Sequence, residues 1–452
     1  MKANALKDKF FIFCMVLKYL VILLPLLVMT GGYHYAQAET LFLEPRITLE
    51  QEYTDNILFT RNSEEKDFIT TISPAFLIKQ KSPRLNGNLM AEINSIFYQD
   101  FDELDSVDKR GSGDLNYRFS ERFTLGASAG YLEDSRTDRE VGETGLILTG
   151  DRKQIRGGLS GQYHITEITA LSFSAGYTTE DIEAPDNEGN DSISAQLTLS
   201  RNISKWFANT TAIFNIGYTT YTSDYEDVRQ VGYDELPDDV LIIVIDEQEG
   251  DPQASLLQSY YADSTSDVWS LTAGFSRDLT ERFSFFMKAG TSCILSDESS
   301  RFSVTADQDT VIYDAQNDYD AGTTWGWLLF SGMSYLGEYD RISLDISRDV
   351  RAASGMNGTT ERSAISVGYT RRITDKLSTD FSGSTYLNQR ERETTSDIDE
   401  LTYNAAAGAT WLFLPTWRAS LNWKYTRLED RETDLSRERN VIWARVVKTF
   451  EL

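Results

Sequence analysis

The chain has 452 residues and a formal net charge of −27, from 70 acidic and 43 basic side chains. Such an acidic chain disfavours a nucleic-acid partner. Of its two cysteines and two histidines, Cys14 and His34 lie in the first 38 residues. Cys293 and His164 then remain, which are too few for a disulfide framework or a two-histidine metal site, and we expect no cofactor.

The first 38 residues have the pattern of a secretory signal peptide. Lysines precede an apolar run over 10–29, and a small-residue cleavage site ends at Ala38. A membrane anchor is the alternative, because about 20 apolar residues can span a bilayer. Lys18 and Pro25 interrupt the run, so we expect cleavage after Ala38 and a signal peptide over 1–38.

Downstream, apolar and polar residues alternate with a period of two. Over 123–131, Phe, Leu, Ala and Tyr hold the odd positions and Thr, Gly and Ser the even ones, and the pattern recurs over 171–177, 401–413 and 417–425. This period predicts strands with one apolar and one polar face. In a soluble sandwich the polar face would meet water, whereas in a large barrel the apolar face meets lipid and the polar face lines a wet lumen.

Three features favour the barrel. The alternating segments suit tilted spans of roughly 9–11 residues plus overhang. Very short links alternate with long acidic loops, as expected for periplasmic turns and outer loops. Aromatic residues flank both strand ends: Phe119, Phe123, Trp206, Phe283, Trp411 and Trp417 beside the short links, and Tyr131, Tyr177, Tyr218 and Trp269 opposite.

The short links set the strand count. They fall near 81–83, 120–122, 166–168, 204–206, 280–282, 337–339, 374–376 and 414–416. Links between nine hairpins predict about 18 strands, or 16 if the first hairpin is a periplasmic extension. We expect the first strand over Pro45–Tyr53, the second over Phe68–Lys79 and the last over about Arg439–Phe450. Pro74 lacks a ladder donor and predicts a bulge or register break.

Two outer loops are long. The first, over 225–263, contains an apolar stretch at 240–245 between acidic turns. Either it folds inward and caps the mouth, or it is an extended hairpin above the membrane. The second, over 299–320, is expected to be an outer loop with its own short strand at 311–313.

The polar parity predicts which charged residues line the lumen. The candidates are Arg118, Arg156, Glu92, Lys288, Arg341, Asp345, Asp380, Arg390, Arg418 and Lys424. With the other charged residues of this parity, Arg46, Arg351, Glu50, Glu52, Asp114 and Asp349, the wall has nine basic and seven acidic residues. The two signs are therefore close to balance, and selectivity by charge is not indicated. The alternative for each residue is an ion pair with a neighbouring strand. Arginine and tyrosine on this face also suit sugars, through carboxylate pairing and ring stacking.

No catalytic or metal site is predicted. The sole downstream histidine, His164, lies beside the short link at Thr166, the wrong end for surface proteolysis. Acidic clusters at 234–239 and 314–320 match no calcium-loop spacing, which favours solvated loops. We therefore expect that the protein is not an enzyme.

The segment from Pro45 to Phe59 reads PRITLEQEYTDNILF. Within it, Tyr53-x-Asp55-Asn56-Ile57 resembles the opening strand and loop of the β-barrel porin type 2 family. The chain is also similar to outer-membrane proteins encoded with exopolysaccharide and PEP-CTERM sorting systems. This resemblance implies an outer-membrane barrel that serves polysaccharide export, and it carries over no catalytic or binding residue.

The sequence therefore predicts a single all-β domain over 39–452, a transmembrane antiparallel up-and-down barrel in the outer membrane of a Gram-negative cell. Two functions stay open: a porin-like channel for passage or export of polysaccharide or oligosaccharide, and a plugged structural or interaction barrel at the cell surface. The expected partners are outer-membrane lipids, lipopolysaccharide, the barrel-assembly machinery and exopolysaccharide.

Overall fold

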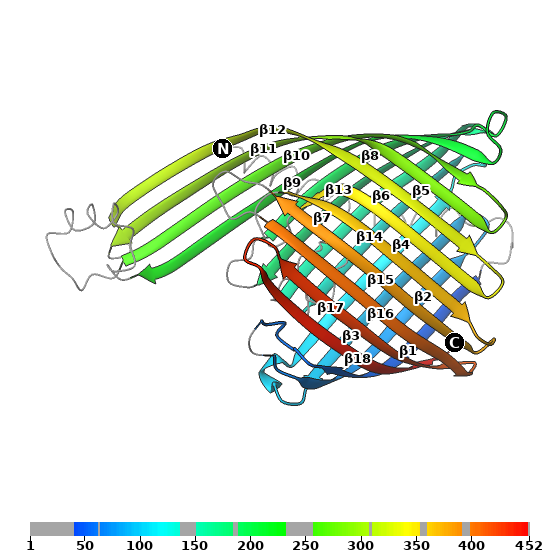
Figure 1. The fold of residues 1–452 in the computed structure, drawn as a ribbon, viewed down its shortest axis with the longest axis horizontal. Coiled ribbons are helices and arrows are strands. Elements are labelled where there is room, and N and C mark those ends of the chain that lie inside the picture. The colour runs from blue at the N-terminus through cyan, green and yellow to red at the C-terminus, as the bar shows by residue number, and fades with distance from the viewer. Residues whose placement is uncertain are drawn as a thin grey trace, which may run out of the picture.

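The computed structural model describes residues 40–61, 64–135, 151–183, 189–231, 256–306, 310–352, 359–390 and 398–450. They form one 18-stranded antiparallel sheet that closes on itself, because β1 pairs with both β2 and β18 (Figure 1). The prediction of an 18-stranded all-β barrel is confirmed, and the alternative of 16 strands is wrong. The predicted signal peptide lies outside the described residues. Within the described part of the chain, no helix is long and apolar enough to span a membrane.

Each strand pairs with its neighbours in sequence, so the barrel is an up-and-down meander. The strands are β1 Thr40–Thr54, β2 Asp67–Lys81, β3 Leu85–Tyr98, β4 Ser106–Arg118, β5 Phe123–Asp134, β6 Asp151–Thr166, β7 Thr169–Glu183, β8 Gly189–Asn202, β9 Thr210–Val231, β10 Leu256–Asp278, β11 Phe283–Ala306, β12 Thr310–Leu336, β13 Asp340–Ala352, β14 Thr359–Arg372, β15 Leu377–Arg390, β16 Ile398–Leu414, β17 Trp417–Asp430 and β18 Leu435–Thr449. One 3-10 helix, η1 (Asp102–Leu104), follows β3.

All of the predicted short links connect strands at one end of the barrel, the turn end. Their residue types explain the tightness. The Ser120 hydroxyl accepts the Phe123 backbone N–H at 3.1 Å, and Thr280 and Thr374 accept the equivalent N–H groups at 3.0 Å. A Ser or Thr hydroxyl that binds the backbone two or three residues on stabilises a turn.

The two strand faces differ as the alternation predicts. Large apolar side chains of one parity are exposed on the outside, for example Leu89 and Leu421, which are 54% and 59% exposed. Exposed aromatics border this belt: Trp206 and Trp411 at the turn end, and Trp269 near the opposite, loop end. The ladder closes on itself and leaves no open sheet edge between the first and last strands, so this architecture suits lipid.

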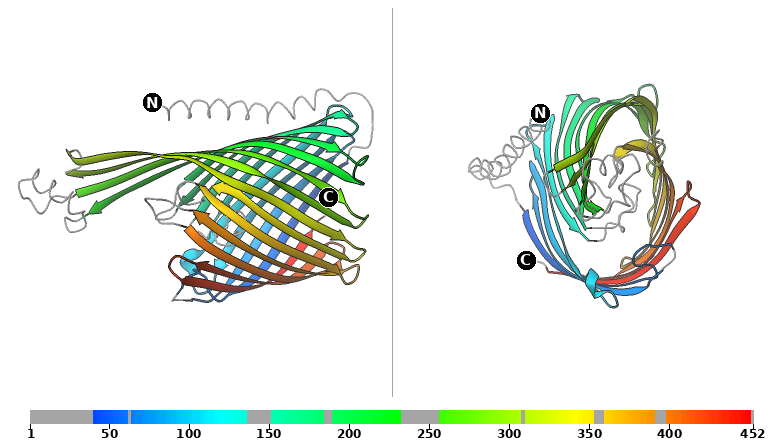
Figure 2. Two further views of the ribbon diagram at one scale, coloured as in Figure 1. Left: turned by 45° about the horizontal axis from the view of Figure 1, so that its top comes forward. Right: turned by 90° about the vertical axis from the view of Figure 1, so that its left-hand side faces the viewer.

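Strands β9 to β12 extend past the other strands at the loop end (Figures 1 and 2). We call this four-stranded extension the arm. It corrects the predicted loop over 299–320, because β11 and β12 pair through this region. It also shortens the predicted loop over 225–263, whose flanks pair as β9 and β10. The polar and acidic residues here suggested loops, yet the ladder continues through them; the stretch at 240–245 lies outside the described residues.

Charges on the arm are partly paired. Arg301 donates to Asp314 at 2.8 and 2.6 Å. This hydrogen-bonded ion pair holds the pKa of the Asp314 carboxyl below its usual value. The predicted acidic cluster at 314–320 therefore includes a carboxylate that already has a cation partner.

The prediction of a break at Pro74 was wrong. The β2–β3 pairs Ile72 with Ser95 and Ala75 with Glu92 keep the same register on both sides of the proline. Only the pairings of Ser73 and Pro74 with β3 are absent, while Pro74 still lies opposite Ile47 of β1. The backbone of Pro74 has no N–H donor, so the ladder loses a local contact there, but no bulge residue is inserted and the register does not shift.

Candidate functional site: the polar lumen wall

The inner face of β4 to β8 is a wall of hydroxyl and amide groups. One row in register holds Asn116, Gly126, Ser160, Ser174 and Gln196. The next row toward the turn end adds Thr124, Gln162, Ser172 and Thr198. These rows line a hollow of about 440 Å³ with no charged side chain among its lining residues.

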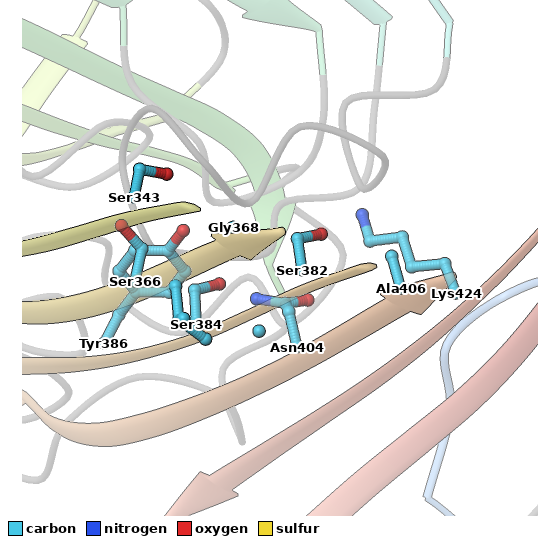
Figure 3. A pocket seen from close by; sticks show the side chains of 11 residues that line it. Ser343, Ser366, Gly368, Ser382, Ser384, Tyr386, Asn404, Ala406 and Lys424 are labelled. Carbon is cyan, nitrogen blue, oxygen red and sulfur yellow. The ribbon is translucent and has the colours of Figure 1, made fainter. Parts of the chain in front are cut away.

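A second hollow lies on β13 to β17 (Figure 3). Its first row in register holds Ser343, Gly368, Ser382, Ala406 and Lys424. The next row, toward the loop end, contributes Ser366, Ser384 and Asn404, and Tyr386 follows above it. The volume is about 350 Å³.

The two walls face each other. Their middle strands, β6 and β15, lie half a turn apart in the 18-stranded ring. The end-on view in Figure 2 shows this ring of strands. A solute inside the barrel would therefore meet hydroxyl and amide groups on opposite sides.

Five predicted lumen residues have inner-face contacts that can be named. Glu92 accepts a hydrogen bond from Arg46 at 2.8 Å, so it pairs with a nearby strand. The Lys288 ammonium lies 5.2 Å from the Phe330 ring centroid. Asp345 and Asp380 lie beside Gly332 and Gly408, respectively, since a Cβ added at either glycine would meet a carboxylate oxygen at 2.8 Å. Lys424 lines the second hollow.

The other five are placed by register alone. Arg118 pairs with Thr124, Arg156 with Gly130, Arg341 with Thr370, Arg418 with Val447 and Arg390 with Ile398. These positions share the inner parity, and the Arg390 side chain lies outside the described part. The ten candidates are spread around the wall. Only Arg341, Asp345, Asp380 and Lys424 come together, around the second hollow.

A buried charged band at the loop end was missed by the sequence analysis. Its inner-face members include Arg362, Glu400, Arg437 and Arg439, and Arg362 and Arg439 are each 2% exposed. The alternating pattern on β16 starts at residue 401 and the predicted last strand starts at about Arg439, so Glu400 and Arg437 fall just outside the predicted segments. The available signal was parity: Arg362 continues the polar register of Ser366 and Gly368.

This band lies beyond the apolar belt, because the outer face at its level carries charged pairs such as Arg427 with Glu429. Burial, followed by the nearby Arg351, lowers the pKa of Arg362 to about 10. Burial raises the pKa of Glu400, against the opposing effect of Arg437. Both side chains are thus held where their charged forms are penalised.

The first loop folds onto this band through Asp55, Asn56 and Phe59, which we call the first-loop clasp. Asn440 of β18 donates its backbone N–H and its amide to the Asp55 carboxylate at 2.7 and 2.9 Å. The Asn56 amide donates to the Glu438 carbonyl of β18 at 3.0 Å. The clasp extends the β1–β18 seam beyond the last strand pair.

Phe59 is the apolar part of the clasp and is 1% exposed. It packs with Leu428, and the guanidinium carbons of Arg437 and Arg439 lie 5.8 and 5.0 Å from its ring centroid. Cation–π contacts of this length stabilise buried rings. The first loop is therefore fixed against the inner wall.

No protein-family model and no curated protein matches the chain. Among solved structures, it is similar to the ferric-catecholate import receptor Fiu of E. coli K12, with 8% identity over 91% of this chain and 82% of that one and a TM-score of 0.46. It is similar to the ferric yersiniabactin uptake receptor of Yersinia pestis, with 8% identity, 90% and 80% coverage and a TM-score of 0.41. A monoaromatic hydrocarbon channel gives 11% identity, 92% and 90% coverage and a TM-score of 0.32. At these identities and TM-scores, the solutes of those proteins are not carried over to this chain.

The fold and the wall by themselves define a class, a transmembrane antiparallel β-barrel with an apolar outer belt and a hydroxyl-rich inner face. The membership in the porin type 2 family indicated by Tyr53, Asp55 and Asn56 stays a prediction.

Proposed function

We propose that the chain is an outer-membrane channel that passes hydroxyl-rich solutes of the oligosaccharide or polysaccharide class. The observation that supports it is the pair of opposed walls on β4–β8 and β13–β17. Hydroxyl and amide groups both donate and accept, so they can replace the water bound to sugar hydroxyls.

The outer membrane is the location that the architecture favours. A closed barrel satisfies its backbone within the bilayer, and short turns at one end with long strands and loops at the other are typical of outer-membrane barrels. The turn end would then face the periplasm and the arm would lie outside the cell. Protease protection of a tag inserted in the 166–169 turn, in intact cells, tests this orientation.

Single-channel recording in planar bilayers, with swelling of proteoliposomes in neutral oligosaccharides, tests the channel. We expect stable openings and entry of the sugars. Silence from protein whose circular dichroism and heat-modifiable gel mobility show a folded barrel would contradict the proposal.

A second function is supported by the first-loop clasp, which sets Phe59 against the inner wall beside buried Arg439. In this function the barrel is plugged and acts at the surface, in contact with exopolysaccharide or an envelope partner. It predicts a folded, silent wild-type barrel that conducts only after residues 55–61 are replaced by a short glycine-serine turn.

A further inference from the structure

We infer that the hollow on β13–β17 is a binding subsite for one pyranose unit of a neutral saccharide. This inference rests on the proposed channel and adds to it a specific place where the solute binds. It follows from the shape of the hollow, from its one aromatic ring and from its balance of charges.

Small residues make the floor of the hollow. Gly368 and Ala406 occupy one row with Ser382 between them. A Cβ at Gly368 would lie 2.8 Å from the Ser343 hydroxyl, so a larger side chain here would fill the space. The volume of about 350 Å³ is within the range of small-molecule sites, about 300–1,000 Å³.

Tyr386 gives the hollow an aromatic surface at its loop end. The Arg362 guanidinium carbon lies 4.0 Å from the ring centroid, and Arg362 is itself 2% exposed. A buried cation stacked on the ring restricts its rotation. The ring therefore borders the hollow in a fixed position, where it can pack against the C–H groups of a sugar ring.

Polar groups lie between Tyr386 and Lys424, which occupy opposite ends of the hollow (Figure 3). Ser382, Ser384 and Asn404 lie between these ends and supply donors and acceptors for sugar hydroxyls. Lys424 adds a donor.

The nearby charges favour an uncharged ligand. Asp345 lies in the row toward the loop end, and Arg341 and Asp380 lie in the row toward the turn end. With Lys424, the first lining row and the rows on either side of it hold two acidic and two basic side chains, and Arg362 lies further toward the loop end on the Tyr386 ring. A charged sugar would be attracted by the two side chains of opposite sign and repelled by the two of like sign. Sugar hydroxyls, in contrast, can accept hydrogen bonds from the basic side chains and donate them to the acidic ones.

The hollow on β4–β8 provides an internal comparison. Its lining residues on the inner face carry the same hydroxyl and amide types but no aromatic ring and no charge, and Arg118 lies beside Thr124 at the edge of one row. We therefore assign the specific subsite to β13–β17 and expect the β4–β8 wall to be a polar lining.

The test is binding of maltohexaose to the folded full barrel in detergent, by calorimetry, together with sugar-induced block of single-channel current. We expect Tyr386→Ala to weaken binding about tenfold, the size of one aromatic contact. Gly368→Leu should abolish binding. Gly130→Leu is the matched control, because a Cβ at Gly130 on the inner face of β5 meets only ordinary contacts, the nearest at 3.8 Å.

Ser382→Leu, which fills the same hollow from a residue with a side chain, replaces Gly368→Leu if that variant does not fold. Equal affinity of the wild type and the folded filling variant would overturn the inference. So would binding of an anionic oligogalacturonate in place of maltohexaose. A barrel that conducts sugars without binding them refutes the subsite alone, whereas one that binds maltohexaose yet stays silent refutes the channel alone.

Discussion

The first-loop clasp predicts a large local effect of a small substitution, Asn56→Ala. The Asn56 side chain is fully buried and makes three hydrogen bonds. Its amide donates to the Thr60 and Glu438 carbonyls at 2.8 and 3.0 Å, and its carbonyl accepts the Thr60 N–H at 2.9 Å. Alanine removes all three and leaves backbone groups without a partner.

The magnitude follows from these bonds. A buried hydrogen bond contributes about 1 kcal/mol net, so the loss of three gives about 3 kcal/mol, and stranded backbone groups act in the same direction. The loop can open without unfolding the barrel, so this energy appears mainly as local opening. At about 1.4 kcal/mol per factor of ten, amide exchange at Thr60 should rise about 100-fold.

Hydrogen exchange measured by mass spectrometry on peptides over 55–61 and 437–441 is the assay. Asn88→Ala is the control, because Asn88 is exposed on the inner wall and donates only to Asp114. We expect both peptides to exchange faster in Asn56→Ala than in the wild type, and to exchange at the wild-type rate in Asn88→Ala. Unchanged protection at Thr60 in Asn56→Ala would refute the clasp.

Three further predictions concern the ring, the faces and the charged band. Phe59→Ala should destabilise the clasp by about 3–5 kcal/mol, the range for a buried ring, and expose Arg61 to trypsin. Leu421→Arg, on the lipid face, should destabilise the barrel in urea titrations in lipid vesicles by about 2–4 kcal/mol, whereas Ser420→Arg on the inner face should have little effect. The raised pKa of Glu400 means that the folded state binds its proton more tightly, so its contribution to stability is full below pH 4.5 and is lost as the pH rises through the raised pKa. Glu400→Gln should remove that pH dependence from urea titrations.

Each has an outcome that contradicts it. Resistance of Phe59→Ala to trypsin equal to the wild type would mean that Phe59 does not hold the loop. Equal destabilisation by Leu421→Arg and Ser420→Arg would contradict the assignment of one residue to the lipid face and the other to the inner face. A Glu400→Gln variant that keeps the same loss of stability with rising pH would place the titrating group elsewhere.

The fold could be predicted because alternation and turn chemistry agree. Ser120, Thr280 and Thr374 start turns that sequence and structure share, and the turns fix the number of strands. The arm could not be predicted, because its outer-face residues are polar where no lipid demands apolar ones. Asp263, for example, lies opposite Asp224 in a regular ladder, a like-charge pair that propensity would disfavour.

The wall was predictable by parity and the hollow was not. Parity places Lys424 and Asp380 on the inner face, but the depression depends on Gly368, Ser382 and Ala406 lying in one row across three strands. That adjacency depends on cross-strand register, which alternation within one strand does not determine. Residues such as Arg362 were missed because the strand continues beyond the apolar pattern.

The motif that carries the family resemblance has a structural meaning in this chain. Asn56 donates to the carbonyl of Glu438, 382 residues away, and Asp55 binds Asn440 two residues further on. These contacts join the first strand to the last, and neither residue lines a hollow. Selection for this motif would therefore act on closure of the barrel, so chains that share it can differ in solute. The identity of the solute has to come from the residues of the walls, above all Tyr386 and Gly368.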